Sequence, residues 1–223
     1  MGEKIKELNP LGYKPVGKLL KSLAIPAIIA NLVNALYNVV DQIFIGQGIG
    51  YLGNAATNIA FPITTMCLAI GLTLGIGGAS NFNLELGKGC PEKSKHTAGT
   101  AASTLIIIGI ILCITVRIFL EPLMIGFGAT DKILEYSMEY TGITSYGIPF
   151  LLFSIGVNPL VRADGNAKYS MIAIVIGAIL NTILDPLFMF VYNWGIAGAA
   201  WATVISQIIS ALLLLIYFPK FKS

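Results

Sequence analysis

Six long apolar stretches dominate the sequence, at residues 19–46, 58–84, 98–119, 140–160, 169–192 and 196–218. A helix needs about 20 mainly apolar residues to cross the hydrocarbon core of a bilayer, and each stretch meets that length. Only 11% of the residues are charged, against about 25% in ordinary soluble domains, so this chain lacks the charge to cover a soluble globule. The sequence predicts an all-α membrane protein with six transmembrane helices.

The lysines and arginines are distributed unevenly around these spans. With an even number of spans, one side of the membrane holds twelve of the 14 basic residues: Lys4, Lys6, Lys14, Lys18, Lys21, Lys88, Lys93, Lys95, Arg162, Lys168, Lys220 and Lys222. Only Arg117 and Lys132 fall on the other side. Because cytoplasmic loops carry the excess of basic residues, both termini are expected in the cytoplasm and the chain in the cell membrane.

This topology gives three segments. Residues 1–18 are expected to form a cytoplasmic N-terminal segment, residues 19–218 a six-helix transmembrane lobe, and residues 219–223 a cytoplasmic tail or the start of a linker between lobes. The net charge of +3 comes from lysines in the loops. We therefore expect the lipid bilayer as a partner and no nucleic acid.

Enzyme chemistry has little support in the sequence. The cysteines are Cys67, Cys90 and Cys113, without a Cys-x-x-Cys spacing, and the single histidine is His96. These residues predict neither a metal site nor a disulfide framework. No nucleophile stands with a base, so we expect no catalytic residues, no metal, no cofactor and no enzyme activity.

The first span carries an unusual row of polar side chains. Asn31, Asn34, Asn38 and Asp41 follow each other at steps of three, four and three residues, and Tyr37 lies beside them. These steps place the row on one face of a helix. Since lipid offers no partner to such groups, this face is expected to line a bundle interior or a watery cavity. For each asparagine, a hydrogen bond between helices is an equally good interpretation.

A second acidic residue lies deep in the fifth span. Asp185 follows Asn181 at an i, i+4 spacing, and sliding the chain by 144 residues aligns Asp185 with Asp41. Neither aspartate has a cationic partner in its span, which favours a functional carboxyl that binds a proton or another cation. Pro186 directly follows Asp185 and predicts a bend at that carboxyl, although prolines are also tolerated in membrane helices.

Small residues in the second span indicate close packing between helices. These are Gly71, Gly75 and Gly78. Similar glycines occur in many membrane helices, so the pattern points to no particular function.

Three segments together carry a resemblance to a known family. They are LAIPAIIANLVNALYNVVDQIFIG in the first span, NPLVRADGNAKYS in the fourth connection, and GAILNTILDPLFMFVYNWGIAGAAWATVISQ across the last two spans. From Lys18 onward the chain resembles the amino-terminal half of multidrug and toxic compound extrusion (MATE) transporters, in the bacterial branch of MepA-like and DinF-like exporters.

The resemblance implies a fold and a site. It implies one six-helix lobe of a MATE-type transporter with a coupling-cation site formed by Asp41, Asp185, Asn181, Tyr37, Thr203 and Tyr140, while Asn31, Asn34 and Asn38 line the cavity. Such transporters use a proton or sodium gradient to expel organic, often cationic, drugs by alternating access between two lobes. The partners implied are drug-like substrates and a second six-helix lobe, either a missing C-terminal half or a second copy.

Two other functions stay open at this point. One is a flippase for lipid-linked precursors with the same superfold, which is disfavoured because the cavities of such flippases tend to be strongly basic. The other is a membrane subunit that does not transport, which the asparagine row permits and the matching segments disfavour.

Overall fold

The computed structural model describes residues 15–221, and this part of the chain is helical throughout, with short connections and no strand. Its α-helices are α1 (Val16–Gly48), α2 (Tyr51–Gly87), α3 (Pro91–Ile118), α4 (Leu120–Gly126), α5 (Asp131–Thr144), α6 (Ile148–Ala163), α7 (Ala167–Pro186) and α8 (Gly195–Tyr217). Three shorter segments are η2 (Ser145–Gly147), η3 (Leu187–Val191) and η4 (Phe218–Lys220). Most of the predicted N-terminal segment, with Lys4, Lys6 and Lys14, lies outside the described residues, as does Lys222 of the predicted tail.

The prediction of six membrane-spanning helices is confirmed in the described part of the chain. Six helical stretches are long and apolar enough to cross a membrane, and the fourth of them runs from Asp131 to Ala163 through α5, η2 and α6. The connection predicted at about residues 121–135 proves to be largely helical, because it contains α4 and the start of α5. Met124 holds α4 in place, since its side chain is fully buried and accepts a hydrogen bond from Thr141 Oγ1 of α5 at 3.3 Å.

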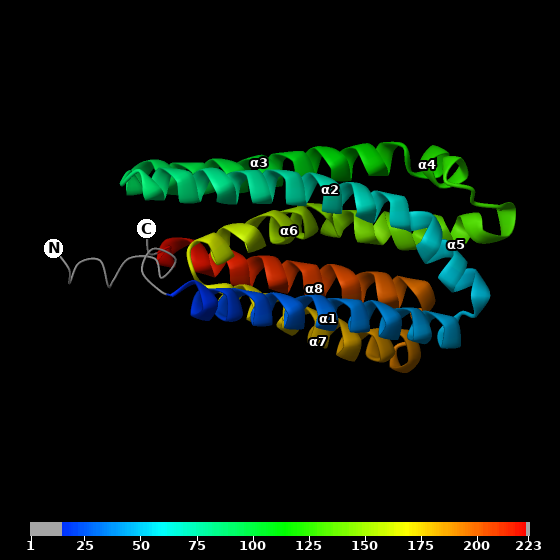
Figure 1. Cartoon of the computed structure of the whole chain (residues 1–223). Coiled ribbons are helices and arrows are strands. Elements are labelled where there is room, and N and C mark those ends of the chain that lie inside the picture. Colours follow the sequence, from blue (N-terminus) through cyan, green and yellow to red (C-terminus); the bar gives the residue numbers. More distant parts are fainter. Residues whose placement is uncertain (1–14, 222–223) are drawn as a thin grey trace.

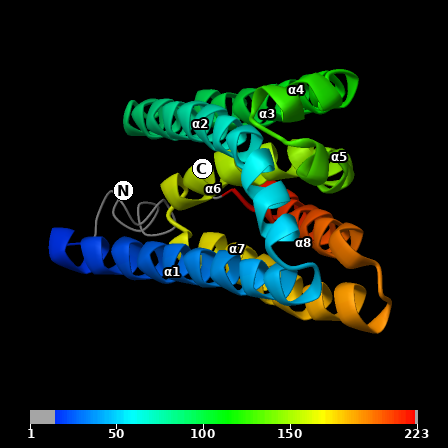
Figure 2. The same cartoon turned by 90° about the vertical axis from the view of Figure 1, so that its right-hand side faces the viewer.

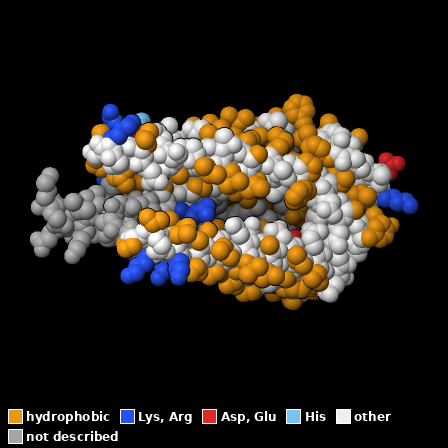
Figure 3. Space-filling model, viewed as in Figure 1, with side chains coloured by type: hydrophobic (Ala, Val, Ile, Leu, Met, Phe, Trp, Pro, Cys, Tyr) orange, Lys and Arg blue, Asp and Glu red, His pale blue; other side chains and the backbone are white. Residues whose placement is uncertain are grey.

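The helices form two groups that α8 connects (Figures 1 and 2). In one group α6 packs between α2 and α3, with α4 and α5 at one end, and in the other α1 runs along α7. By contrast, α1 and α2 touch little although they are consecutive. A hollow separates the two groups on the face shown in Figure 3.

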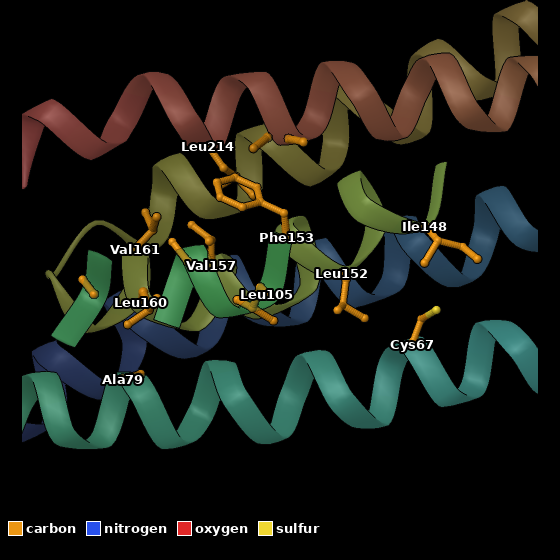
Figure 4. Close-up of a cluster of buried hydrophobic side chains, with 14 of the residues drawn as sticks. Cys67, Ala79, Leu105, Ile148, Leu152, Phe153, Val157, Leu160, Val161 and Leu214 are labelled. Carbon is orange, nitrogen blue, oxygen red and sulfur yellow. The ribbon is translucent and has the colours of Figure 1, made fainter. Parts of the chain in front are cut away.

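Helix α6 lies at the centre of the main apolar core. Leu152, Val157 and Leu160 of this helix are fully buried and belong to one cluster with side chains of α2, α3 and α8. Figure 4 shows Leu152 and Leu160 on either side of Leu105 of α3, and Val157 between Leu105 and Leu214 of α8. The large apolar side chains on the outside of the bundle, such as those along α1 and α3, are exposed as a lipid-facing surface requires.

Glycines allow α6 to approach its neighbours closely, as the sequence predicts. On α2, Gly75 faces the backbone of Gly156, and a Cβ on Gly75 would overlap it. On α3, a Cβ on Gly109 would lie 2.6 Å from Cα of Pro149. Small residues at these crossings let the helix backbones touch, which is how helices gain packing in a membrane without a hydrophobic driving force between them.

The start of α1 and the end of α8 lie at the same end of the molecule (Figure 1). Most basic side chains visible in Figure 3 gather at this end. An even number of spans brings the start of α1 and the end of α8 to the same side. The basic side chains at this end agree with the charge bias of the sequence. That this end faces the cytoplasm stays a prediction.

Candidate cation site between α1, α5, α7 and α8

Two buried aspartates form the centre of the candidate site. Asp41 of α1 is 7% exposed and Asp185 of α7 is fully buried. Because α1 packs along α7, their carboxyl groups interact directly. Carboxylates have no hydrogen to donate, and Asp41 Oδ1 and Asp185 Oδ2 find no donor among the described residues. A proton or a small cation between the two groups would supply the missing partner.

An amide from α7 holds Asp185 and extends the site to α8. Asn181 Nδ2 donates to Asp185 Oδ1 at 3.2 Å and to Thr203 Oγ1 at 3.4 Å. Its amide oxygen Oδ1 is buried and has no hydrogen-bond partner among the described residues. Carboxylate, amide and hydroxyl oxygens thus meet in one place, and these are the oxygen ligands that hard cations prefer.

Two tyrosines complete the group of residues predicted for the cation site. Tyr140 of α5 lies beside Thr203 and close enough to interact electrostatically with both aspartates. Tyr37 of α1 lies beside Asn38 and is likewise near both carboxyl groups. The structure therefore brings all six predicted residues together from four helices. Their role in binding a cation stays a prediction.

The asparagine row of α1 lies on the open side of the helix. Asn31 and Asn34 are exposed, and Asn38 Nδ2 donates to the backbone oxygen of Asn34 at 2.7 Å. Asn38 also lines an open hollow of about 530 Å³ together with Gln42 and Asn54. In the described part of the chain this row faces no enclosed cavity, so its predicted role in lining one depends on what covers this face.

Two residues near the aspartates were missed in the sequence. Gln42 Nε2 lies 3.4 Å from Asp41 Oδ2, and Thr57 Oγ1 donates to Gln42 Oε1 at 3.1 Å. Through them the site also reaches α2. Gln42 lies beside Asp41 and therefore off the three- and four-residue spacing of the polar row. Thr57 lies one residue before the second span predicted from residue 58.

The helix bearing Asp185 changes type at the predicted position. α7 ends at Pro186, and η3 continues it as a π-helix in which Tyr192 N donates to Leu187 O at 3.0 Å. Proline cannot donate to the preceding turn, and π-helical turns occur frequently at functional sites. The helix thus changes type directly beside the carboxyl, while the bend predicted at Pro186 stays a prediction.

The fold and the site together define a class of protein, the six-helix lobe of a membrane transporter. The family model described as MatE matches residues 26–187. The chain belongs to this family of multidrug and toxic compound extrusion transporters and corresponds to the amino-terminal half of such a protein.

Individual relatives agree with this assignment. Multidrug export protein MepA of Staphylococcus aureus is 27% identical over 217 residues, covering 97% of this chain and 48% of that protein. The probable multidrug resistance protein YoeA of Bacillus subtilis is 26% identical, covering 93% and 46%. A solved structure described as an outward-facing multidrug resistance MATE transporter of the MOP superfamily matches with a TM-score of 0.82 and 30% identity, covering 90% and 44%. The chain spans about half the length of these relatives.

Proposed function

We propose that this chain is the cation-coupling lobe of an antiporter that exports organic, cationic compounds across the cell membrane in exchange for protons or sodium ions. The observation that carries the proposal is the contact between Asp41 and Asp185, buried between α1 and α7 with one unpartnered oxygen on each carboxyl. Two carboxylates in contact repel each other and are costly to bury, so this site favours an added positive charge.

The positions of the proposed ligands support alternating access. Asp41 and Asp185 belong to the group of α1 and α7, whereas Tyr140 belongs to α5 beside the other group. A bound cation is in contact with both groups, and its departure weakens the connection between them. Binding a cation on one side of the membrane and releasing it on the other can thereby alter the arrangement of the lobe.

A second lobe and a substrate belong to the same proposal. The relatives are named for multidrug export and are about twice as long as this chain. We propose that a second six-helix lobe, either a C-terminal half or a second copy, covers the face that carries the asparagine row. The exported compound would then bind between the two lobes, in contact with Asn31, Asn34 and Asn38.

Replacing either carboxyl with an amide of the same shape tests the proposal. Asp41→Asn and Asp185→Asn should each abolish export of a fluorescent organic cation from vesicles that hold the chain with its second lobe, under an imposed proton or sodium gradient. The amide keeps the shape of the carboxyl but not its charge, so folding should be nearly unaffected. Asp131→Asn is the matched control, because Asp131 is exposed at the start of α5. Normal gradient-driven export by both buried-site variants would refute the proposal.

A further inference from the structure

The fourth membrane span is broken in the middle. α5 ends at Thr144, η2 makes one tight turn at residues 145–147, and α6 begins at Ile148. Within the break Ile148 N donates to Ser145 O, a bond across three residues instead of four. Tyr140 lies on α5 about one helical turn before the break.

Arg117 at the end of α3 reaches across to this break. Its Nη1 donates to the backbone oxygen of Gly142 at 3.0 Å and lies 3.4 Å from Ser145 Oγ. Ser145 Oγ donates to the same oxygen of Gly142 at 2.7 Å. Two side chains thus bind a backbone carbonyl of α5 just before the tight turn, and such side-chain bonds stabilise irregular helices within a membrane.

The guanidinium also connects the break to α8. It lies over the ring of Tyr146 at 4.2 Å from the centroid. On α8, Trp201 stacks on Tyr146 with a centroid distance of 6.3 Å and an angle of 11° between the rings. Trp201 stands two residues before Thr203, which lies beside Tyr140 and accepts from Asn181. The contacts of Arg117 therefore reach α8, the helix that carries Thr203, through Tyr146 and Trp201.

We propose that Arg117 is a positioning residue of the cation site: it holds the break at Gly142–Ser145 and, through Tyr146 and Trp201, keeps Tyr140 and Thr203 in register with Asp41 and Asp185. The proposal rests on the cation site proposed above. Arg117 touches none of the proposed ligands itself and is exposed at the end of its helix. Snorkelling of Arg117 toward the membrane surface would explain its location at the end of α3, but it would not explain the bond to the Gly142 carbonyl.

Trp201 offers a direct reporter for this arrangement. The chain has two tryptophans, so Trp194→Phe leaves Trp201 as the single one. In this background, the purified chain in lipid nanodiscs is titrated with sodium at constant pH and, separately, with protons at constant ionic strength, while Trp201 emission is recorded. Arg117→Met should weaken the apparent cation affinity by about tenfold, the effect of losing one charge-assisted hydrogen bond. Arg117→Lys, which keeps a charged donor, should restore part of it.

Further variants make the outcome decisive. Lys132→Met removes a basic charge at the same end of the bundle and should leave the affinity unchanged. Ser145→Ala removes the other donor to Gly142 and should weaken cation binding in the same direction as Arg117→Met. If Arg117→Met and Ser145→Ala lower the melting temperature but leave the affinity equal to that of Lys132→Met, the positioning role is wrong. If the Trp201 emission of Asp41→Asn changes with sodium and with protons as it does in the parent chain, the proposed cation site is wrong.

Discussion

At the scale of single residues, Asn181 and Thr203 decide how the aspartates are held. The amide nitrogen of Asn181 donates to both Asp185 and Thr203, and Thr203 also lies beside Tyr140. The Thr203 hydroxyl therefore contacts residues of both α5 and α7. Its removal takes one hydrogen-bond partner from the buried Asn181 amide, which keeps only its bond to Asp185.

Thr203→Val should weaken cation binding by about three- to tenfold, as expected for the net loss of one hydrogen bond of about 1 kcal/mol. Thr182→Val is a matched control on α7, because Thr182 Oγ1 donates only to the backbone oxygen of Ala178 within its own helix. Cation titration of both variants by calorimetry checks this. Equal affinity in the two variants would show that the Thr203 hydroxyl is not part of the site.

How far the site could be predicted differs from residue to residue. Asp41 and Asp185 can be recognised from the sequence because a carboxyl without a cation is rare in an apolar span. Asn181 follows from its i, i+4 spacing to Asp185. Thr203 is recognisable only as one polar residue of the sixth span, and the family resemblance alone pointed to Tyr140 and to the place of Thr203 in the site. Gln42 was missed because its contact to Thr57 depends on how α1 meets α2.

At the scale of helices, the number and approximate position of the spans could be predicted, but the contacts that hold the break in the fourth span could not. Apolar length alone determines where a helix can cross the bilayer. The turn at residues 145–147, by contrast, is stabilised by Arg117 from another helix. Pro149 lies two residues after the turn and has no N–H to donate to Ser145 O, which accepts from Ile148 N instead. Helix α4 was missed because Met124 is buried by tertiary contacts.

The crossing of α2 and α6 gives a prediction about stability. Gly75→Ala should lower the melting temperature, because the added methyl group overlaps the backbone of Gly156, and overpacking a tight core costs about 1–3 kcal/mol. Gly77→Ala on the same helix should be neutral or slightly stabilising, since nothing lies within 4 Å of its added carbon and alanine favours helices. Thermal unfolding in detergent compares the two. A Gly75→Ala protein as stable as Gly77→Ala would contradict the packing described here.

At the scale of the whole molecule, the orientation in the membrane can be tested with single cysteines. Lys93→Cys and Asp131→Cys both place a thiol at an exposed position, near opposite ends of the bundle, after Cys67, Cys90 and Cys113 are replaced. An impermeant thiol reagent added to intact cells should label the site at 131 and not the site at 93, because the basic end is expected inside. Labelling at 93 from outside would reverse the topology.

The shared end of the first and last described helices has a consequence for how such a protein can arise. A reading frame that encoded this lobe twice, head to tail, would insert the second copy in the same orientation as the first, because an even number of crossings returns the chain to its starting side. Both copies would obey the same charge rule, and an axis along the membrane normal would relate them. Gene duplication followed by fusion therefore yields a parallel pair of lobes directly, whereas a lobe with an odd number of crossings would yield an inverted pair.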